Sequence, residues 1–457
     1  MTLSTSRILL KKGVLLIHDK DGNVNPVRSD LLVEGDKIVQ ISDDIEASGD
    51  HVKVFDCEGK VISPGFISTH HHVWQTALKG RHANHSLLEY LPTGSYAGAL
   101  YSADDAFWGE LGGALEAIDG GTTTVVDHSS LNVGPSTDDY TSPDVLVPWK
   151  SLASNGPYGD GRIQLGFAVD NVHQSPDEMK KLYSELRAAK AKVITSHSAG
   201  GLAYGNGPSV AQLLEGHGLL GPDILVSHAI SPRDGDAGLF AKRDAHISST
   251  PNTELQAGAP PSSLGVDCHS WGSSFMPSQM RLGLQHARTE RCADLGRQGK
   301  WSRHVGPSAE QVFNLATIGG ARAIGMAGEV GQIRVGAKAD LVIFDTGSPS
   351  MLPAAEEDPV AAIVLHSSER DVETVIVGGV IRKEDGKLMP VSVAHEVPGA
   401  IDLGLVGKEI TWKDVAKELL ESRKRLNEKV EGIDMKAAEE VVITNFYMNR
   451  KDMVEQA

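Results

Sequence analysis

A short apolar segment that runs straight into three consecutive histidines constrains the fold of this chain more than any other feature. Residues 62–80 read ISPGFISTHHHVWQTALKG, with β-branched residues ahead of the histidines. Alternate residues of a β-strand share a face, so His70 and His72 point to one side and His71 to the other. A purification tag would stand at a terminus and would not follow an apolar strand. Two imidazoles at a strand end are half of a metal site, and the rest of the chain must supply the other ligands.

Strand and helix patterns alternate through the middle of the chain. Helical patterns fall at 103–118, 175–190, 208–218, 237–243 and 309–326, and apolar strands at 122–128, 162–170, 192–197, 223–229, 245–250 and 262–267. Continuous apolar strands between helices are typical of a parallel sheet that is covered on both faces. The sequence therefore predicts an α/β fold with a (β/α)8-type, TIM-like barrel, in which the C-terminal strand ends meet on one face.

Several of these strands end in a side chain that can bind a metal ion. His197, His228 and Asp267 each stand at the end of an expected strand, as His70 and His72 do. A single histidine among the 18 would more often be structural, but five donors placed at strand ends are not expected from chance. Nitrogen and oxygen donors that converge on one face of a barrel would suit Zn²⁺ or Fe²⁺.

Both ends of the chain have a strand-and-turn character that the middle lacks. We expect residues 1–61 and 331–390 to form the two parts of one small β-sandwich, and residues 62–330 to form the metal-binding βα barrel. Residues 391–457 are expected to be a helical tail that begins near Thr411 and Asp414, which resemble a capping box. The basic residues of the tail fit a solvated helix face, and the tail is also a candidate for oligomer contacts.

The composition excludes several classes of partner. The chain has 43 basic and 60 acidic residues, so its net charge is −17, which disfavours nucleic acid or an anionic membrane as the main partner. Its three cysteines show no CxxC spacing, which favours a reducing, cytoplasmic compartment. No apolar run approaches the ~20 residues of a membrane span. We expect a cytoplasmic homo-oligomer that acts on a small molecule.

In combination, these motifs resemble the amidohydrolase superfamily, and within it the branch of cytosine deaminase, triazine hydrolase and guanine deaminase-like enzymes. The resemblance spans about residues 8–390 and rests on His197, His228 and five segments: PGFISTHHHVWQTALKG (64–80), GGTTTVVDH (120–128), STPNTELQAG (249–258), SLGVD (263–267) and GEVGQIRVGAKADLVIFD (328–345). It implies a metal-bearing βα barrel and a β-sandwich that is built from both chain ends.

The resemblance also implies roles for individual residues. One divalent metal ion, zinc in the first place and iron as an alternative, would be held by His70, His72, His197 and Asp267. His228 would contact the attacking water or the substrate, and Asp267 would also accept a proton from that water. The residues implied for substrate binding are Trp74, Gln75, His228 and Glu254. Ordinary packing is the alternative role for Trp74 and Gln75.

One departure from the family pattern concerns the acid of the reaction. Many hydrolytic deaminases of this group carry a glutamate three residues after the histidine of the fifth strand, where it protonates the ring nitrogen under attack. Here His197 is followed by Ser-Ala-Gly, so that acid is missing. The candidates to replace it are His71, His128, His269 and Glu254.

A second departure concerns the barrel itself. Between the strands at 122–128 and 192–197 a complete barrel needs two further strands, and only 162–170 has a strand pattern. The segment 252–264 is also too short for a normal helix between the last two strands. We therefore expect a barrel that lacks a strand, which would leave an unpaired edge.

These observations favour a metal-dependent hydrolase that acts on a non-peptide carbon–nitrogen bond, in an amide, an amidine or an aminated ring. Two alternatives stay open. The missing glutamate suggests a metal-dependent lyase or decarboxylase that uses the same site. The shortened barrel suggests a non-catalytic binding or assembly protein with this fold.

Overall fold

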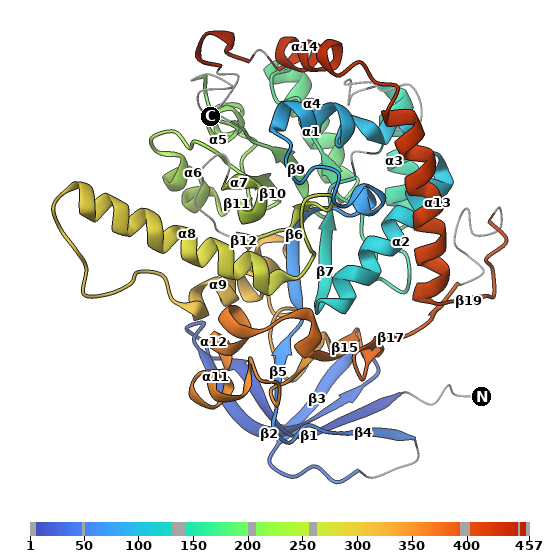
Figure 1. The fold of residues 1–457 in the computed structure, drawn as a ribbon, viewed down its shortest axis with the longest axis vertical. Coiled ribbons are helices and arrows are strands. Elements are labelled where there is room, and N and C mark those ends of the chain that lie inside the picture. Colours follow the sequence, from blue (N-terminus) through green and yellow to red (C-terminus); the bar gives the residue numbers. More distant parts are fainter. Residues whose placement is uncertain are drawn as a thin grey trace.

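The computed structural model describes residues 6–47, 51–129, 131, 142–199, 207–255, 263–393, 403–446 and 448–453. A large β-sheet lies at one end of the molecule, and the parallel strands with their helices lie above it (Figure 1). Helix α13 runs along one side of the barrel, and helix α8 projects from the opposite side.

The sheet at the base combines strands from both parts of the chain. Its order is β17-β16-β15-β14-β5-β1-β2-β3, with β4 paired to β1. The bounds are β1 (Arg7–His18), β2 (Val24–Glu34), β3 (Lys37–Ser42), β4 (Val52–Asp56), β5 (Lys60–Pro64), β14 (Leu341–Asp345), β15 (Val372–Val377), β16 (Val380–Glu384) and β17 (Lys387–Leu388). Strand β14 pairs antiparallel with both β5 and β15, so it joins the N-terminal and C-terminal strands.

A bend in β1 shapes this sheet. The register of β1 against β2 shifts between Leu10 and Gly13, and Lys12 between them has a φ of 64°. The first half of β1 pairs with β4, and the second half pairs with β5. Apolar side chains from both chain ends, such as Leu31 and Leu341, pack in one buried cluster.

Parallel strands form the barrel region in two hydrogen-bonded groups, β12-β11-β10-β9-β8 and β13-β6-β7. The bounds are β6 (Phe66–His72), β7 (Thr122–Asp127), β8 (Phe167–Ala168), β9 (Ile194–His197), β10 (Ile224–Ser227), β11 (His246–Ser249), β12 (Ser263–Leu264) and β13 (Asp267–Cys268). Strands β12 and β13 are two parts of one short stretch of chain, so this stretch links the two groups. Thr69 Oγ1 reinforces the link, because it lies 2.7 Å from Ser248 Oγ and 2.9 Å from Ser263 Oγ.

Helices surround these strands. Their bounds in the barrel region are η1 (Val73–Leu78), α1 (Leu87–Thr93), η2 (Tyr96–Leu100), α2 (Ala103–Asp119), α3 (Pro143–Asn155), α4 (Pro176–Ala188), α5 (Val210–His217), α6 (Asp236–Arg243), α7 (Pro251–Glu254), α8 (Met276–Arg297), α9 (Ala309–Leu315) and α10 (Ile318–Ala323). The later elements are α11 (Leu352–Glu357), α12 (Pro359–Ala361), η3 (Ala362–His366), η4 (Glu369–Asp371), β18 (Val391–Ser392), β19 (Glu409–Ile410), α13 (Trp412–Val430), α14 (Met435–Asn445) and η5 (Arg450–Asp452). Within the described ranges, no helix combines the length and apolar character that crossing a membrane requires.

The expected gap in the barrel lies between β7 and β8. Among described residues 142–166, the chain forms α3 and an isolated bridge between Tyr158 and Ile163, and no strand there pairs with β7. The predicted strand at 162–170 is wrong over most of its length, because only Phe167 and Ala168 pair with β9. Val126 of β7 packs against a cluster that includes Val193, so apolar contact replaces part of the missing ladder.

The helical tail is packed against the barrel region. The capping box at the start of α13 is formed, since the side chains of Thr411 and Asp414 each accept a hydrogen bond from the backbone N–H of the other residue. Arg423 donates to the carbonyl oxygen of Lys79, just after η1. Leu419 lies so close to Gly112 of α2 that a Cβ there would come within 2.6 Å of it. The tail therefore braces the segment that follows strand β6.

We expect Arg425→Ala to lower the free energy of unfolding by about 1–3 kcal/mol, because it leaves a buried carboxylate without its cationic partner. Arg425 lies 2.5 Å from the Oδ1 atom of Asp105, whose side chain is 1% exposed. The measurement is urea denaturation followed by circular dichroism. Arg450→Ala is the matched control, because its pair with Glu440 is exposed and its loss should leave the free energy of unfolding nearly unchanged. Equal effects of the two substitutions would contradict the bracing role.

Candidate metal centre

Residues from four distant parts of the chain meet in one group, in which His70 and Asp267 are buried and His197 and His228 are partly buried. His70, His197, His228 and Asp267 offer ligand atoms that all lie within 4.8 Å of one another. His72 joins them, because the His70 ring centroid is 4.9 Å from those of His72 and His197. Strands β6 and β9 supply three of the histidines, while His228 follows β10 and Asp267 opens β13. The structure therefore brings together all five strand-end donors that the sequence indicated.

The spacing of the inward atoms matches the coordination shell of a small divalent cation. His72 Nε2 lies 3.3 Å from His197 Nε2, and Asp267 Oδ1 lies 3.2 Å from His70 Nε2 and 3.3 Å from His72 Nε2. Ligands about 2.0–2.1 Å from a tetrahedral ion are separated by about 3.3 Å. His70 Nε2 is buried and makes no well-directed hydrogen bond. The donor set thus fits a divalent metal ion, with imidazole nitrogens and one carboxylate oxygen.

Each of the four histidines has its outer nitrogen fixed by an oxygen atom. The Nδ1 contacts are His70 to Ser227 Oγ at 2.8 Å, His72 to the His128 carbonyl oxygen at 2.7 Å, His197 to Asp170 Oδ1 at 3.0 Å and His228 to Thr250 Oγ1 at 2.9 Å. A carbonyl oxygen only accepts, so His72 must carry its proton on Nδ1. Its Nε2 atom then presents a lone pair to the centre, which is the arrangement of metal-binding histidines.

The charges of the group also suit a cation. Burial lowers the pKa of His70 well below its usual range, so its imidazole is neutral and able to coordinate. Burial by itself would raise the pKa of Asp267, but His228, His70 and His72 outweigh it and hold that pKa well below its usual range. Asp267 is therefore an ionised carboxylate among imidazoles at neutral pH.

Two of the site residues have a strained backbone. His228 has a φ of 71° and Asp267 a φ of 67°, in the left-handed region. Such conformations cost on the order of 1–3 kcal/mol and persist where surrounding contacts impose them, often at functional sites. The backbone N–H of His228 donates to the Ser248 carbonyl oxygen at 2.8 Å. These conformations turn the two side chains out of the strand direction and toward the centre.

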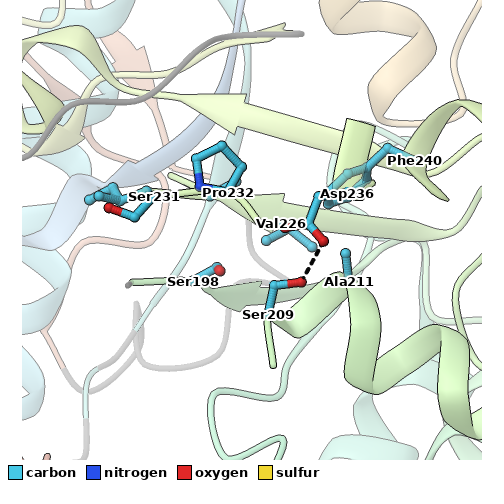
Figure 2. Close-up of a pocket in the computed structure, with 10 residues that line it drawn as sticks. Ser198, Ser209, Ala211, Val226, Ser231, Pro232, Asp236 and Phe240 are labelled. Atoms are coloured by element: carbon cyan, nitrogen blue, oxygen red, sulfur yellow. Dashed lines mark hydrogen bonds between the residues drawn. The ribbon is translucent and has the colours of Figure 1, made fainter. Parts of the chain in front are cut away.

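A small cavity lies behind the loop that follows β10. It measures about 10 Å³, which is room for roughly one water molecule, and Ser198, Ser209 and Asp236 are among its lining residues. Figure 2 shows the Ser209 hydroxyl pointing at Asp236, to which it donates at 2.8 Å. The other oxygen of Asp236 accepts from the backbone N–H of Arg233 at 2.7 Å. The cavity is too small for a substrate, and the two hydrogen bonds to Asp236 hold the loop after β10 against the start of α5.

A profile of the Amidohydrolase family matches residues 61–202 and 155–382 of the chain. The chain belongs to the amidohydrolase family. It is 26% identical over 411 residues to the 5-methylthioadenosine/S-adenosylhomocysteine deaminase of Thermococcus sibiricus, a match that covers 81% of this chain and 93% of the relative. It is 25% identical over 419 residues to the 5'-deoxyadenosine deaminase of Methanobrevibacter smithii, with 84% and 94% covered.

Solved structures share the fold of this amidohydrolase. A zinc-bound adenosine deaminase from Xanthomonas campestris superposes with a TM-score of 0.73 at 16% identity, covering 94% of this chain and 99% of its own. Atrazine chlorohydrolase from Arthrobacter aurescens, complexed with zinc, gives 0.72 at 17% identity, with 92% and 100% covered. The predicted family and the predicted TIM-like fold class are both confirmed.

Of the residues predicted to bind substrate, Trp74, Gln75 and Glu254 are buried in this amidohydrolase, and His228 is partly buried. Trp74 packs against Tyr101, with ring centroids 5.0 Å apart, so ordinary packing accounts for its position. Gln75 donates to the Tyr90 hydroxyl at 2.7 Å. Glu254 lies behind His228, 3.3 Å from its Nδ1 atom, and accepts from the Thr250 backbone N–H. Substrate contact by Trp74, Gln75, His228 and Glu254 stays a prediction.

Asp170 orients a proposed ligand, His197, and was not among the residues predicted from the sequence. Asp170 Oδ1 accepts the backbone N–H of His197 at 2.8 Å and faces its Nδ1 atom, while Oδ2 lies 3.4 Å from His128 Nε2. The signal was present, because Asp170 ends the predicted strand at 162–170 just as His197 ends the next one. The rule that located the histidines would have located this carboxylate.

The four candidates for the missing acid lie on different sides of β6. The His71 ring is 4.8 Å from that of His269, whose Nε2 atom is 2.9 Å from Glu116, and this cluster is on the face away from the other histidines. The His128 ring is 4.2 Å from that of His197, and Glu254 contacts His228. Of the four, His128 and Glu254 are the two in contact with the candidate metal centre.

We expect Asp170→Asn to weaken metal binding by about 10- to 100-fold, because it removes the charged partner that orients His197. The measurement is competition for the metal against a coloured chelator. Asp223→Asn is the matched control, since Asp223 forms a surface pair with Arg187 and should leave metal affinity unchanged. Unchanged affinity of the Asp170 variant would show that His197 does not need this carboxylate.

The neighbouring carboxyl groups of Glu110 and Asp127 predict that the stability of the fold depends on pH. Burial and the neighbouring Asp127 raise the pKa of Glu110 in α2 to about 9. The folded state therefore keeps a proton that the unfolded state releases above its pKa of about 4.5, so stability falls as pH rises from about 5 to 9. Glu110→Gln should flatten this slope, by up to ~1.4 kcal/mol per pH unit. Urea denaturation at a series of pH values measures it, and parallel profiles for the wild-type and variant proteins would refute the raised pKa of Glu110.

Proposed function

We propose that this amidohydrolase is a metal-dependent hydrolase that cleaves a non-peptide carbon–nitrogen bond of a small molecule. The observation that carries the proposal is the buried group of four oriented imidazoles around the Asp267 carboxylate. The names of the curated relatives support it, because they are deaminases of 5-methylthioadenosine, S-adenosylhomocysteine and 5'-deoxyadenosine.

We also propose a reducing, cytoplasmic location for the protein. This agrees with the free thiols of its three cysteines, Cys57, Cys268 and Cys292.

His70, His72, His197 and Asp267 are the proposed ligands of one ion. We propose zinc, because three imidazoles and a carboxylate at tetrahedral spacing are a common zinc donor set and because two structural neighbours contain zinc. Iron is the alternative that the same donors allow. Such an ion, when bound, lowers the pKa of a coordinated water toward ~7 and polarises the bond under attack.

Asp267 and His228 are proposed to handle the proton and the substrate. Asp267 is ionised at neutral pH, so it can accept the proton of the attacking water and pass it to the leaving amine. His228 Nε2 lies 3.9 Å from Asp267 Oδ1. Its Nδ1 atom is held by Thr250 and Glu254, which leaves Nε2 to orient the water or the atom under attack.

We infer that the substrate is an aminated ring, and that 5'-substituted adenosines are the first class to test. The chain covers more than nine-tenths of the curated deaminases that it resembles. The glutamate that would protonate such a ring is missing after His197. His128 and Glu254 are the candidates in contact with the site, and a ring nitrogen that is already basic would need the least help from either.

We expect ammonia release from at least one member of a panel of adenosine derivatives, guanine, cytosine and aminated triazines, and about one bound metal ion per chain. Asp267→Asn should lower kcat/KM by at least ~10²-fold, because it removes both a ligand and the proton acceptor. The measurements are a coupled ammonia assay and elemental analysis of protein that was purified without chelators. Asp294→Asn, in an exposed pair with Arg297, is the control that should keep full activity.

The same experiment separates the alternatives. Product that carries ¹⁸O from labelled water indicates hydrolysis, whereas turnover without incorporation of ¹⁸O indicates the lyase or decarboxylase that the missing acid suggested. Metal-free protein with no turnover on the panel would contradict the proposal and favour the non-catalytic alternative.

A further inference from the structure

The C-terminal half of α8 and the loop after it form an arm that the rest of the chain does not cover. Helix α8 begins with buried residues such as Met276, Met280 and Leu284. Beyond Leu284, none of the residues 285–306 is buried. Figure 1 shows this part of α8 projecting sideways from the molecule before the chain returns to α9. We call residues 285–306 the α8 arm.

The α8 arm is polar over most of its length and carries exposed apolar side chains after the end of the helix. Helical segments of this length are marginal in water unless one face packs against something. Trp301 is 83% exposed and Val305 63% exposed, both near the tip. Tryptophan and arginine are enriched among the residues that dominate binding energy at protein interfaces. Isolated exposed apolar residues are common, but a tryptophan at the tip of a projecting arm is a candidate anchor.

The charge of the α8 arm is opposite to that of the rest of the chain. The arm contains five basic residues and two acidic ones, a net charge of +3, whereas the whole chain carries −17, which leaves −20 elsewhere. The basic residues are Arg288, Arg291, Arg297, Lys300 and Arg303. A second copy of this chain therefore offers an acidic surface to the arm, and complementary charge favours association of the two.

An acidic and apolar patch lies beside residues 276–284, the first part of α8, which we call the root of the arm. Arg281 in the root donates to the carbonyl oxygens of Val364 and Ser367, at η3 and just after it, and η3 packs against α11. On α11, Glu356 and Glu357 are exposed and Leu352 is 50% exposed. In a twofold dimer each contact occurs twice, so an arm whose tip reaches the partner's root receives the partner's tip at its own root.

We propose that the α8 arm is the docking surface for a second copy of this chain. In this twofold dimer, Trp301 at the tip packs against Leu352 of α11 in the other copy, and Lys300 and Arg303 pair with Glu356 and Glu357 there. The proposal gives the expected homo-oligomer an interface other than the helical tail, whose helix α13 packs against its own barrel region. It does not depend on the proposed reaction.

Sedimentation equilibrium of the full chain over a range of concentrations and salt tests this interface. The wild-type chain should dimerise, more tightly at low salt. The combined variant Trp301→Ala, Lys300→Glu and Arg303→Glu should raise the dimer Kd by at least about a hundredfold. The control is Lys417→Glu, a charge reversal on an exposed lysine of α13. Circular dichroism and metal content, which should not change, show that each variant is folded.

Charge exchange identifies the contact on α11. Glu356→Lys with Glu357→Lys should weaken the dimer, and joining these changes to Lys300→Glu with Arg303→Glu should restore it. A monomer at every concentration, or a dimer that the arm variants leave intact, would overturn the proposal. Weakening without restoration would overturn the contact with α11. An assembly that nuclease treatment dissolves would mean that the arm binds nucleic acid instead of a second copy.

Discussion

The burial of one carboxylate among four imidazoles is the interaction on which the site depends. Removing the charge of Asp267 from water costs several kcal/mol unless partners compensate for it. The fold provides those partners by ending β6 and β9 in histidines, placing His228 just after β10, and fixing each imidazole through its outer nitrogen. The left-handed conformations of His228 and Asp267 are a further cost of the same arrangement. A bound cation would offset much of both.

The barrel keeps this arrangement although it is open between β7 and β8 in the described part of the chain. The five donors stand on or just after β6, β9, β10 and β13, none of which borders the gap, and the stretch that holds β12 and β13 links the two strand groups. At the gap itself, His128 after β7 lies 3.4 Å from Asp170 after β8. Burial lowers the pKa of His128 to about 4, so the edges are bridged by a neutral imidazole in contact with the carboxylate that also orients His197. Helix α13 supports the neighbouring segment η1 from outside.

Membership of the amidohydrolase family and the local geometry lead to the same class of chemistry but not to the same detail. The relatives are named as deaminases, and the imidazole–carboxylate group suits a metal-assisted hydrolase. The acid expected after the β9 histidine is missing, however, and the two candidates in contact with the site, His128 and Glu254, are already engaged with Asp170 and His228. The substrate must therefore be found by experiment.

The sequence by itself determined the histidine face of β6, the strand-end positions of the five donors, the family and the capping box of α13. The family follows from the combined motifs, and each of the others follows from a local rule, either the period of a strand or the chemistry of a helix start. Only the tertiary structure decided that the predicted strand at 162–170 is two residues long, that Asp170 orients His197, and that Trp74 is packed against Tyr101. These outcomes depend on which distant segments come into contact, and local sequence patterns carry no record of that.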